Sequence, residues 1–134
     1  MDCLFCKIAK KEIASRVIYE DQDTLAFLDI HPIAPGHAVV IPKEHVGTLL
    51  ELDDARVGPF FTSVKVVMRL LERALAPDGF TIGANHGESA GQLVNHLHVH
   101  VIPRFHNDGG KSLHSVVSNP PKEGLDEIYR KIVS

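Results

Sequence analysis

The segment HLHVHVIP, residues 96–103, places an imidazole at every second position: His96, His98 and His100. In an extended strand, alternate side chains point to opposite faces, so these histidines share one face while Leu97 and Val99 share the other. Neighbours on one strand face lie about 6.5 Å apart and can converge on zinc. Alternatively, one neutral imidazole can attack phosphorus while its neighbours handle protons and a backbone carbonyl fixes its tautomer. Three unrelated core histidines are a weaker explanation, because each buried imidazole needs its own hydrogen-bond partner.

Cys3 and Cys6, the two cysteines of the chain, are spaced as C-x-x-C near its start. The segment MDCLFCKIAK has neither the basic nor the apolar stretch of an export signal, so we do not expect a structural disulfide. The pair could be two buried thiols, a redox pair or half of a metal site. A redox pair usually follows a strand, whereas this motif comes almost at the first residue. A zinc site would need two more ligands, and the chain has nine histidines.

Composition limits the classes of protein that need to be considered. With 134 residues, we expect one domain over residues 1–134, large enough to bury a core without disulfides. Hydrophobic residues make up 44% of the chain and charged residues 23%, with a net charge of −3. Duplex nucleic acid is a poor partner for this charge balance, because its binding requires a basic face. We expect no membrane-spanning segment and a cytoplasmic location.

The rest of the sequence supplies the elements that must position these side chains. Apolar and β-branched runs between turn residues predict strands over residues 16–20, 24–29, 37–43, 80–84 and 95–105. Apolar positions recur at intervals of three and four over residues 55–75, which predicts one long helix. In the tail, residues 111–134, a short amphipathic helix would carry Leu125, Ile128, Tyr129 and Ile132 on one face. We therefore expect an α+β domain, an antiparallel sheet with its helices gathered on one face.

Several motifs resemble the histidine-triad (HIT) family, in particular its bacterial and archaeal nucleotide hydrolases. The family signature is His-φ-His-φ-His-φ-φ, where φ is apolar, and HLHVHVI satisfies every position. FCKI near the start, AFLDIHPIAPGHAVVIPKEH in the middle, and NHG followed by AGQ before the triad extend the resemblance over residues 1–110. The tail does not resemble the Trp-bearing C-terminus of the eukaryotic nucleotide-binding branch, and this chain has no tryptophan.

The resemblance implies a HIT-like antiparallel sheet of about five strands with one long helix and short terminal helices. It also implies a homodimeric hydrolase or transferase that acts at the α-phosphate of purine nucleotides. His98 would be the nucleophile that forms a covalent nucleotidyl intermediate, and water would then release a nucleoside monophosphate. His100 would bond the phosphate and assist the leaving group, His37 would complete the phosphate side, and His96 would orient the row.

The same resemblance implies a nucleotide site around the triad. Asp29 would hold the ribose hydroxyls, and residues 87–92 would offer backbone N–H groups to the phosphate, since glycine allows close approach. The implied nucleotide-binding residues are Ile8, Asp29, Ile30, Asn85, Gly91, Gln92, His98 and His100. Ile8 and Ile30 could equally be core residues, Asp29 could start a turn, and Asn85 could cap a loop.

The resemblance further implies a structural zinc ion held by Cys3, Cys6, His45 and His96. Four protein ligands would leave no open position on the metal, so the ion would pin the N-terminal segment beside the triad rather than react. The alternative is two small buried thiols and a His45 that caps a loop.

Other functions remain open at this point. The triad could serve as a ligand set in a metal-dependent or zinc-binding protein, or the chain could be a nucleotide-binding regulator without catalysis. Among hydrolase substrates, adenosine phosphoramidate, dinucleoside polyphosphates and adenylyl sulfates all offer an α-phosphate.

Overall fold

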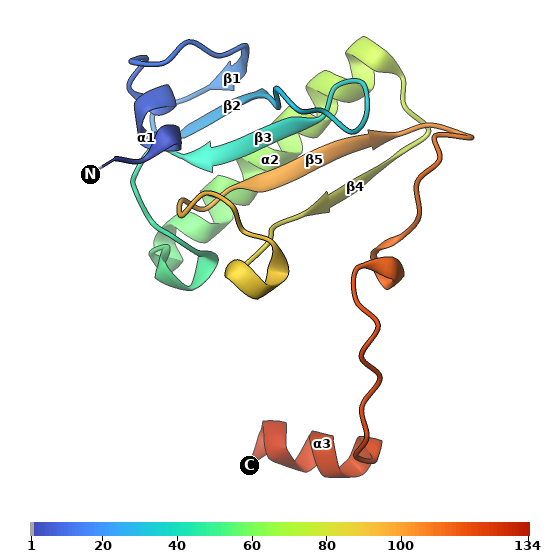
Figure 1. Cartoon of the computed structure of the whole chain (residues 1–134). Helices are drawn as coiled ribbons and strands as arrows, with labels where there is room; N and C mark the ends of the chain where they lie inside the picture. The colour runs from blue at the N-terminus through green and yellow to red at the C-terminus, as the bar shows by residue number, and fades with distance from the viewer. Residues whose placement is uncertain (1) are drawn as a thin grey trace.

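A five-stranded antiparallel sheet in the order β1-β2-β3-β5-β4 organises the chain in the computed structural model, which describes residues 2–134 (Figure 1). The order places β1 and β4 at the two edges and leaves β3 in the centre. This architecture confirms the expected α+β class. The strands are β1 (Val17–Glu20), β2 (Thr24–Leu28), β3 (Ala38–Pro42), β4 (Gly79–Gly83) and β5 (Val99–Arg104).

Helices cover both faces of the sheet, so the prediction that they gather on one face was wrong. The long helix α2 (Asp54–Leu75) packs Val64 and Val67 on the face that carries Val40 and Val99. The short helix α1 (Leu4–Ala9) lies on the opposite face. The physical reason is that β2 and β3 are continuous apolar runs, TLAFL and AVVIP, which are buried along nearly their whole length. A strand that is apolar on both sides needs a cover on both sides.

The helix α1 is stabilised by the residues that it buries and by its first cysteine. Phe5 and Ile8, one helical turn apart, contact a cluster formed by Leu25, Phe27, Val39 and Ile41. The thiol of Cys3 caps the helix by accepting a hydrogen bond from the backbone N–H of Cys6. A six-residue helix would not persist alone in water, so packing on the sheet holds it in place.

The strand that carries the triad is shorter than predicted. We expected a strand over residues 95–105, but β5 begins at Val99, so His96 and His98 precede the hydrogen-bonded ladder. The alternation of faces persists nevertheless. Leu97 and Val99 are buried with α2, whereas the β3–β5 register pairs His100 with Val39, a residue of the α1 face. The backbone N–H of Leu97 bonds to the carbonyl of Val46 instead of to a strand.

The tail contains the predicted short helix, α3 (Leu125–Val133), preceded by a single 3₁₀ turn, η3 (Leu113–Ser115). In Figure 1 this segment leaves the end of β5 and extends away from the sheet. Within residues 2–134, no helix combines the length and the apolar character needed to span a lipid bilayer.

Leu25 allows a direct test of how the α1 face contributes to stability. Its side chain is fully buried in the cluster that α1 covers. We expect Leu25→Ala to lower the free energy of unfolding by about 2–5 kcal/mol, because the substitution removes buried apolar area and leaves a cavity. Leu50→Ala is the matched control, since Leu50 is 86% exposed. Urea denaturation should show a change within about 0.5 kcal/mol for the control, and equal losses in both variants would contradict this packing.

Candidate active site and metal-binding cluster

The imidazole of His98 is buried, and a backbone carbonyl fixes its tautomer. Its Nδ1 lies 2.7 Å from the carbonyl oxygen of His96. A carbonyl oxygen can only accept, so Nδ1 carries the proton and Nε2 keeps a free lone pair. This arrangement confirms the expected carbonyl lock. The ring of Phe5 packs edge to face against His98, with centroids 5.0 Å apart and an interplanar angle of 83°.

A hydrogen bond from His37 fixes His100 in the tautomer opposite to that of His98. The backbone N–H of Ile33 donates to Nδ1 of His37 over 3.2 Å, so the proton of a neutral His37 is on Nε2. That Nε2 lies 2.9 Å from Nδ1 of His100 and donates to it. The remaining proton of His100 is therefore on its Nε2. An acceptor nitrogen on His98 and a donor nitrogen on His100 thus belong to rings whose centroids are 5.2 Å apart.

Burial keeps His37 and His100 neutral. It lowers the pKa of both His37 and His100 from the ordinary value. For His100, the neighbouring His98 and His37 lower the pKa further, while the carboxylate of Asp29 opposes the shift. A neutral ring is what the hydrogen-bond order requires, because a protonated His37 would direct a second donor at the N–H of Ile33.

The free sides of His98 and His100 face a cavity of about 480 Å³, a size that suits a small-molecule ligand. Its apolar walls come from α1, from residues 13–15 and from β2 and β3, and its polar end carries the two histidines and Asn85. Leu93, which is 95% exposed, and Ile30, which is 77% exposed, stand at its rim. The cavity therefore joins an apolar compartment to a polar one that holds the two histidines.

The residues implied for nucleotide binding occupy different places around this cavity. Ile8 is a buried core residue and also a wall of the cavity, so both readings of this side chain hold. Asp29, Ile30, Asn85 and Gly91 line the cavity directly.

Gln92 and His37, by contrast, are not among the lining residues of this cavity. The side chain of Gln92 accepts from the N–H of Gly87 and donates to the carbonyls of Gly47 and Val94. Gln92 thus braces the loop over residues 87–92, while His37 is buried behind His100. The sequence analysis missed Phe5 as a site residue, although its position three residues before Ile8 in a helix could have indicated a shared face.

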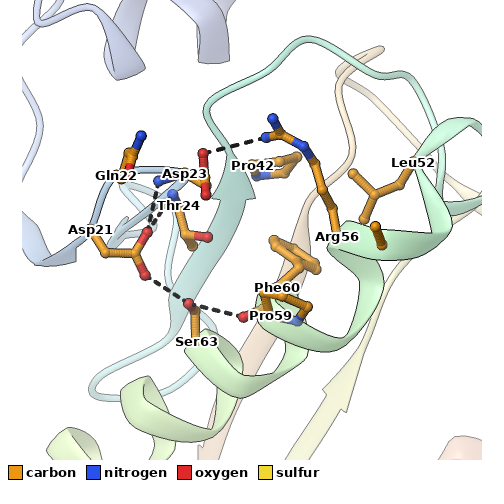
Figure 2. A pocket seen from close by; sticks show the side chains of 11 residues that line it. Asp21, Gln22, Asp23, Thr24, Pro42, Leu52, Arg56, Pro59, Phe60 and Ser63 are labelled. Atoms are coloured by element: carbon orange, nitrogen blue, oxygen red, sulfur yellow. Dashed lines mark hydrogen bonds and ion pairs between the residues drawn. The ribbon is translucent and has the colours of Figure 1, made fainter.

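A second cavity of about 310 Å³ lies on the α2 side of the sheet, next to the turn between β1 and β2 (Figure 2). One of its two acidic residues, Asp21, already accepts four hydrogen bonds. One carboxylate oxygen accepts from the N–H groups of Asp23 and Thr24, and the other accepts from the hydroxyls of Tyr19 and Ser63. This network joins the turn to α2, and the other acidic residue of the cavity, Asp23, pairs with Arg56.

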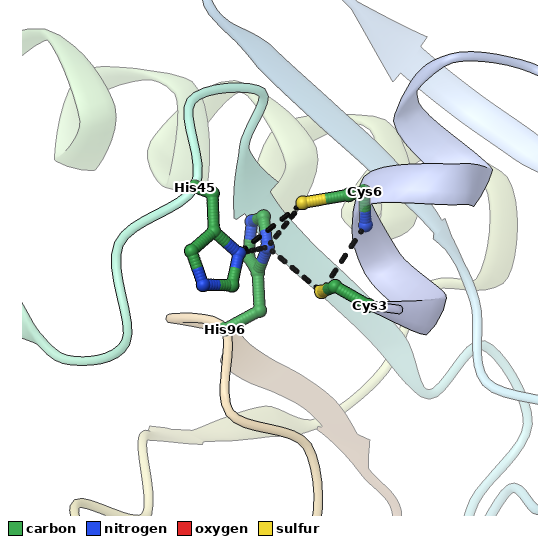
Figure 3. A group of neighbouring side chains, drawn as sticks. All are labelled: Cys3, Cys6, His45 and His96. Atoms are coloured by element: carbon green, nitrogen blue, oxygen red, sulfur yellow. Dashed lines mark hydrogen bonds between the residues drawn. The ribbon is translucent and has the colours of Figure 1, made fainter. Parts of the chain in front are cut away.

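Cys3, Cys6, His45 and His96 converge from three segments of the chain (Figure 3). The Nδ1 atoms of the two histidines are 3.2 Å apart, and Sγ of Cys6 lies 3.2 Å from that of His45 and 3.5 Å from that of His96. Sγ of Cys3 lies 3.5 Å from Nδ1 of His96. Zinc bonds to nitrogen and sulfur of about 2.0–2.3 Å would give tetrahedral edges of about 3.3–3.8 Å. Four of the six distances between donor atoms are therefore close to those of a zinc tetrahedron, and all six are within 4.8 Å.

The surroundings of His96 also suit a metal ligand. Its Nε2 lies 2.8 Å from the carbonyl oxygen of Pro42 and donates to it, so the lone pair of Nδ1 points into the cluster. Burial lowers the pKa of His96, which favours the neutral, ligating form.

A second group of donors, Asp29, His37 and His100, has surroundings that oppose metal binding. A metal at Nε2 of a neutral His37 would move the proton to Nδ1, where the N–H of Ile33 already donates. Its two histidines, His37 and His100, form a hydrogen-bond relay instead. The three triad histidines do not converge on one metal: His96 belongs to the cysteine cluster, His100 to the relay and His98 to neither.

The comparison with known proteins agrees with this geometry. Residues 10–107 match the family model described as the HIT domain. The chain belongs to the HIT family. An uncharacterised HIT-like protein of Methanocaldococcus jannaschii is 42% identical over 97% of this chain and 98% of its own length. An adenosine 5'-monophosphoramidase of Schizosaccharomyces pombe is 40% identical over 82% of this chain and 80% of its own, and an adenylylsulfatase of Arabidopsis thaliana is 37% identical over 80% and 54%.

Solved structures share this fold over most of the chain. A crystal structure of a Streptococcus mutans protein superposes with a TM-score of 0.84 at 40% identity, covering 98% of this chain and 80% of that one. A HIT family protein of Bacillus subtilis superposes with a TM-score of 0.81 at 34% identity, covering 98% and 95%. Coverage of 98% includes the tail as well as the sheet.

The lowered pKa values predict how stability depends on pH. His37 and His100 have folded-state pKa values below the unfolded value of about 6.5. Their contribution to stability is therefore fully present above pH 6.5 and is lost as the pH falls through the folded-state pKa values. We expect urea denaturation to show a smaller loss of stability between pH 7.5 and pH 5.5 in His100→Gln than in the wild type. His106→Asn, which changes an exposed histidine, should keep the full loss, and identical pH profiles in all three proteins would refute the prediction.

Proposed function

We propose that this HIT protein is a nucleotidyl hydrolase or transferase that acts at the α-phosphate of purine nucleotides through a covalent intermediate on His98. The observation that carries the proposal is the pairing of tautomers. The carbonyl of His96 leaves Nε2 of His98 as an acceptor with a free lone pair, and the relay from Ile33 and His37 leaves Nε2 of His100 as a donor. A nucleophile and a proton donor side by side are the two groups that displacement at phosphorus requires.

The proposed reaction has two displacements. Nε2 of His98 attacks the α-phosphorus, a P–N bond forms, and the bond to the leaving group breaks while Nε2–H of His100 supplies its proton. Water then attacks the same phosphorus and gives a proton to Nε2 of His100, and the P–N bond breaks to release a nucleoside monophosphate. Both histidines return to their starting tautomers, because their Nδ1 positions remain bonded to the carbonyl of His96 and to His37.

The cavity supports a nucleotide as the substrate class. Its apolar end, with Phe5, Ile8 and Ile30, suits a purine base, and Asp29, which also lines the cavity, would hold the ribose hydroxyls. Gly87 and Gly91 have φ values of +87° and +93°, which only glycine adopts without strain, so their loop can approach phosphate oxygens closely. Most N–H groups of residues 87–92 already donate within the loop, so we propose those of Glu88 and Ser89 for the phosphate. The relatives named as a phosphoramidase and an adenylylsulfatase favour adenosine phosphoramidate and adenylyl sulfate, with dinucleoside polyphosphates as further substrates to test.

We further propose that the cluster of Cys3, Cys6, His45 and His96 holds a structural zinc ion. The donor set of two thiolates and two imidazoles is one that zinc prefers. When bound, the ion would fix α1 to the segment before β5 and take no part in the reaction. Two free thiols serving as ligands also suit a reducing compartment such as the cytoplasm.

A homodimer is the third element of the proposal. The edge of β4 is unpaired in the sheet order, and Phe61 of α2 is 39% exposed, outside the stripe that packs on the sheet. Unpaired edges and exposed aromatic side chains are common at interfaces between copies. Light scattering at micromolar concentration should therefore give the mass of two chains, and the mass of one chain would refute the dimer.

His98→Ala and His98→Asn test the proposed nucleophile. We expect each to lower kcat for adenosine phosphoramidate by about 10³-fold or more, because direct attack by water must replace the covalent step. AMP affinity, measured by titration calorimetry, should change only a few-fold, since the cavity walls stay in place. His106→Ala, which alters an exposed histidine outside the cavity, is the control. A His98 variant with more than a tenth of wild-type turnover would overturn the assignment.

The wild-type protein also separates the competing functions. A nucleotide-binding regulator would bind AMP tightly and turn over none of the three substrate classes. A metal-dependent enzyme would lose turnover in chelator while its fold stays intact.

Elemental analysis tests the zinc ion. Protein purified without added metal or chelator should contain about one zinc per chain, and Cys3→Ser or His45→Asn should lower both the zinc content and the melting temperature. His114→Asn, an exposed histidine outside the cluster, should change neither. Wild-type protein with well under half an equivalent of zinc and unchanged melting in chelator would leave the pair as two buried thiols.

A further inference from the structure

Cys3 and Cys6 lie together at the first turn of α1. Cys3 directly precedes the helix, and its carbonyl accepts the first helical hydrogen bond, from the N–H of Lys7. Cys6 follows three residues later, and its N–H donates to Sγ of Cys3. Both sulfurs lie 3.5 Å from the same atom, Nδ1 of His96, and within 4.8 Å of each other (Figure 3). The two thiols are therefore neighbours on one helical turn.

The spacing of these two cysteines also suits a disulfide. Residues three apart on a helix have Cα atoms about 5 Å apart, inside the range of about 4.4–6.8 Å that disulfides span. Rotation of the two side chains about their Cα–Cβ bonds would have to bring the sulfurs to a separation of about 2.0 Å. Because the bond would join two residues of one turn, it requires no movement of the sheet.

A third cavity, of about 310 Å³, gives small molecules access to the cluster of cysteines and histidines. Cys3 and His45 line it, together with Asp2 and Leu93. The side chain of Asp2 is 91% exposed and Leu93 is 95% exposed, so this cavity can be reached from solvent. Cys6 is not among the lining residues. An oxidant that enters therefore meets the sulfur of Cys3 first.

The turn that carries the cysteines is also a wall of the cavity that faces His98 and His100. Leu4 and Phe5, the two residues between the cysteines, both line that cavity, and the ring of Phe5 packs on His98. Leu4 lines the third cavity as well, so one helical turn separates the cluster from the proposed substrate site. A bond that changes this turn therefore changes the wall of the substrate site.

We propose that Cys3 and Cys6 form a site of reversible oxidation, at which a hydroperoxide makes a disulfide that detaches α1 from the two histidines of the cluster and weakens nucleotide binding. The motif is not that of a disulfide oxidoreductase, because β1 begins only at Val17, after α1. Transient disulfides that sense oxidants are the kind found in reducing compartments. The effect on nucleotides and the release of zinc rest on the sites proposed above, whereas the disulfide itself requires neither.

The oxidation removes two electrons from the two sulfurs and transfers them to the hydroperoxide. Zinc, when bound, would hold both sulfurs as thiolates, the form that reacts. Sγ of Cys3 attacks one peroxide oxygen, an S–O bond forms, the O–O bond breaks, and the departing oxygen takes a proton from solvent. Sγ of Cys6 then attacks Sγ of Cys3, the S–S bond forms, and the S–O bond breaks to release water after a second proton is taken up. With hydrogen peroxide, the products are one disulfide and two water molecules.

Peptide mass spectrometry tests the disulfide. The protein is treated with a small excess of hydrogen peroxide and free thiols are blocked. Trypsin then cleaves after Lys7 and releases residues 1–7, which contain both cysteines. We expect this peptide to lose two hydrogens, zinc to appear in a colorimetric chelator assay, and dithiothreitol with added zinc to reverse both changes. Free thiols, sulfonic acids or a disulfide between chains would overturn the proposal. Protein purified without zinc would refute the zinc ion alone, since peroxide should still form the disulfide.

Titration calorimetry with AMP tests the effect on the substrate site. A six-residue helix is not stable alone, so α1 depends on its anchors. We expect the oxidised protein to bind AMP about 5-fold or more weakly than the reduced protein, which corresponds to a correctly placed α1 in about a fifth of the molecules. A disulfide that leaves AMP affinity unchanged would overturn the proposal. Reduced protein that does not bind AMP would overturn the proposed nucleotide site and this effect with it, while the peptide mass would still decide the oxidation.

Cys6→Asp is the matched control for the peroxide treatment. Its carboxylate can bind zinc but cannot form a disulfide. Peroxide should therefore leave the AMP affinity of this variant at its own untreated value. Cys6→Ser, which also removes the zinc ligand, should likewise show no response to peroxide. Melting temperatures of the untreated variants show whether each one is folded. A loss of affinity in either variant equal to that of the wild type would overturn the proposal, because another oxidised residue would then be the cause.

Discussion

His96 makes three contacts on which the rest of the site depends. Its Nε2–H bonds to the carbonyl of Pro42 at the end of the central strand β3, its Nδ1 faces the cysteine cluster, and its own carbonyl holds the proton of His98. The side chain is fully buried. The sheet, the N-terminal helix and the proposed nucleophile are therefore connected through one residue. A displacement of His96 would change the metal-binding geometry and the orientation of His98 together.

The backbone determines the protonation of the two nitrogens that we propose to react. The carbonyl of His96 leaves His98 with an acceptor, and the N–H of Ile33, acting through His37, leaves His100 with a donor. Main-chain atoms do not titrate, so these assignments hold wherever the histidines stay neutral, and burial favours that state for His37 and His100. The same argument explains why the cluster of Cys3, Cys6, His45 and His96 suits a metal and the group with His37 does not. Nε2 of His96 donates to a carbonyl, so its Nδ1 is free to bind a metal. Nδ1 of His37 accepts from a backbone N–H, so its Nε2 carries the proton.

The sequence predicted the parts of the structure that depend on local pattern. The common face of the three histidines followed from the alternation with Leu97 and Val99, even though the ladder starts only at Val99, since core packing keeps the alternation in an unpaired segment. The position of α1 did not follow, because six residues are too few to show which sheet face a helix covers. Gln92 illustrates another limit: an amide can bond a ligand or the backbone equally well, and only the loop geometry decides. The amphipathic pattern of α3 was predicted correctly, because it depends only on the spacing of residues within the helix.

The division of the cavity between distant parts of the chain affects how the protein could diversify. Side chains of α1, of residues 13–15 and of β2 and β3 form the apolar end, whereas the polar end combines Asp29 with Asn85, His98 and His100. Leu4 and Ile13 are partly exposed, so exchanging them would cost little stability. Such exchanges would leave the protons of His98 and His100 in place, because backbone atoms elsewhere hold them. For the proposed function, single substitutions near the N-terminus could therefore change the preference among bases without changing the chemistry. Cys3 and Cys6, which belong to the donor cluster, are the positions in and beside α1 that could not change in this way.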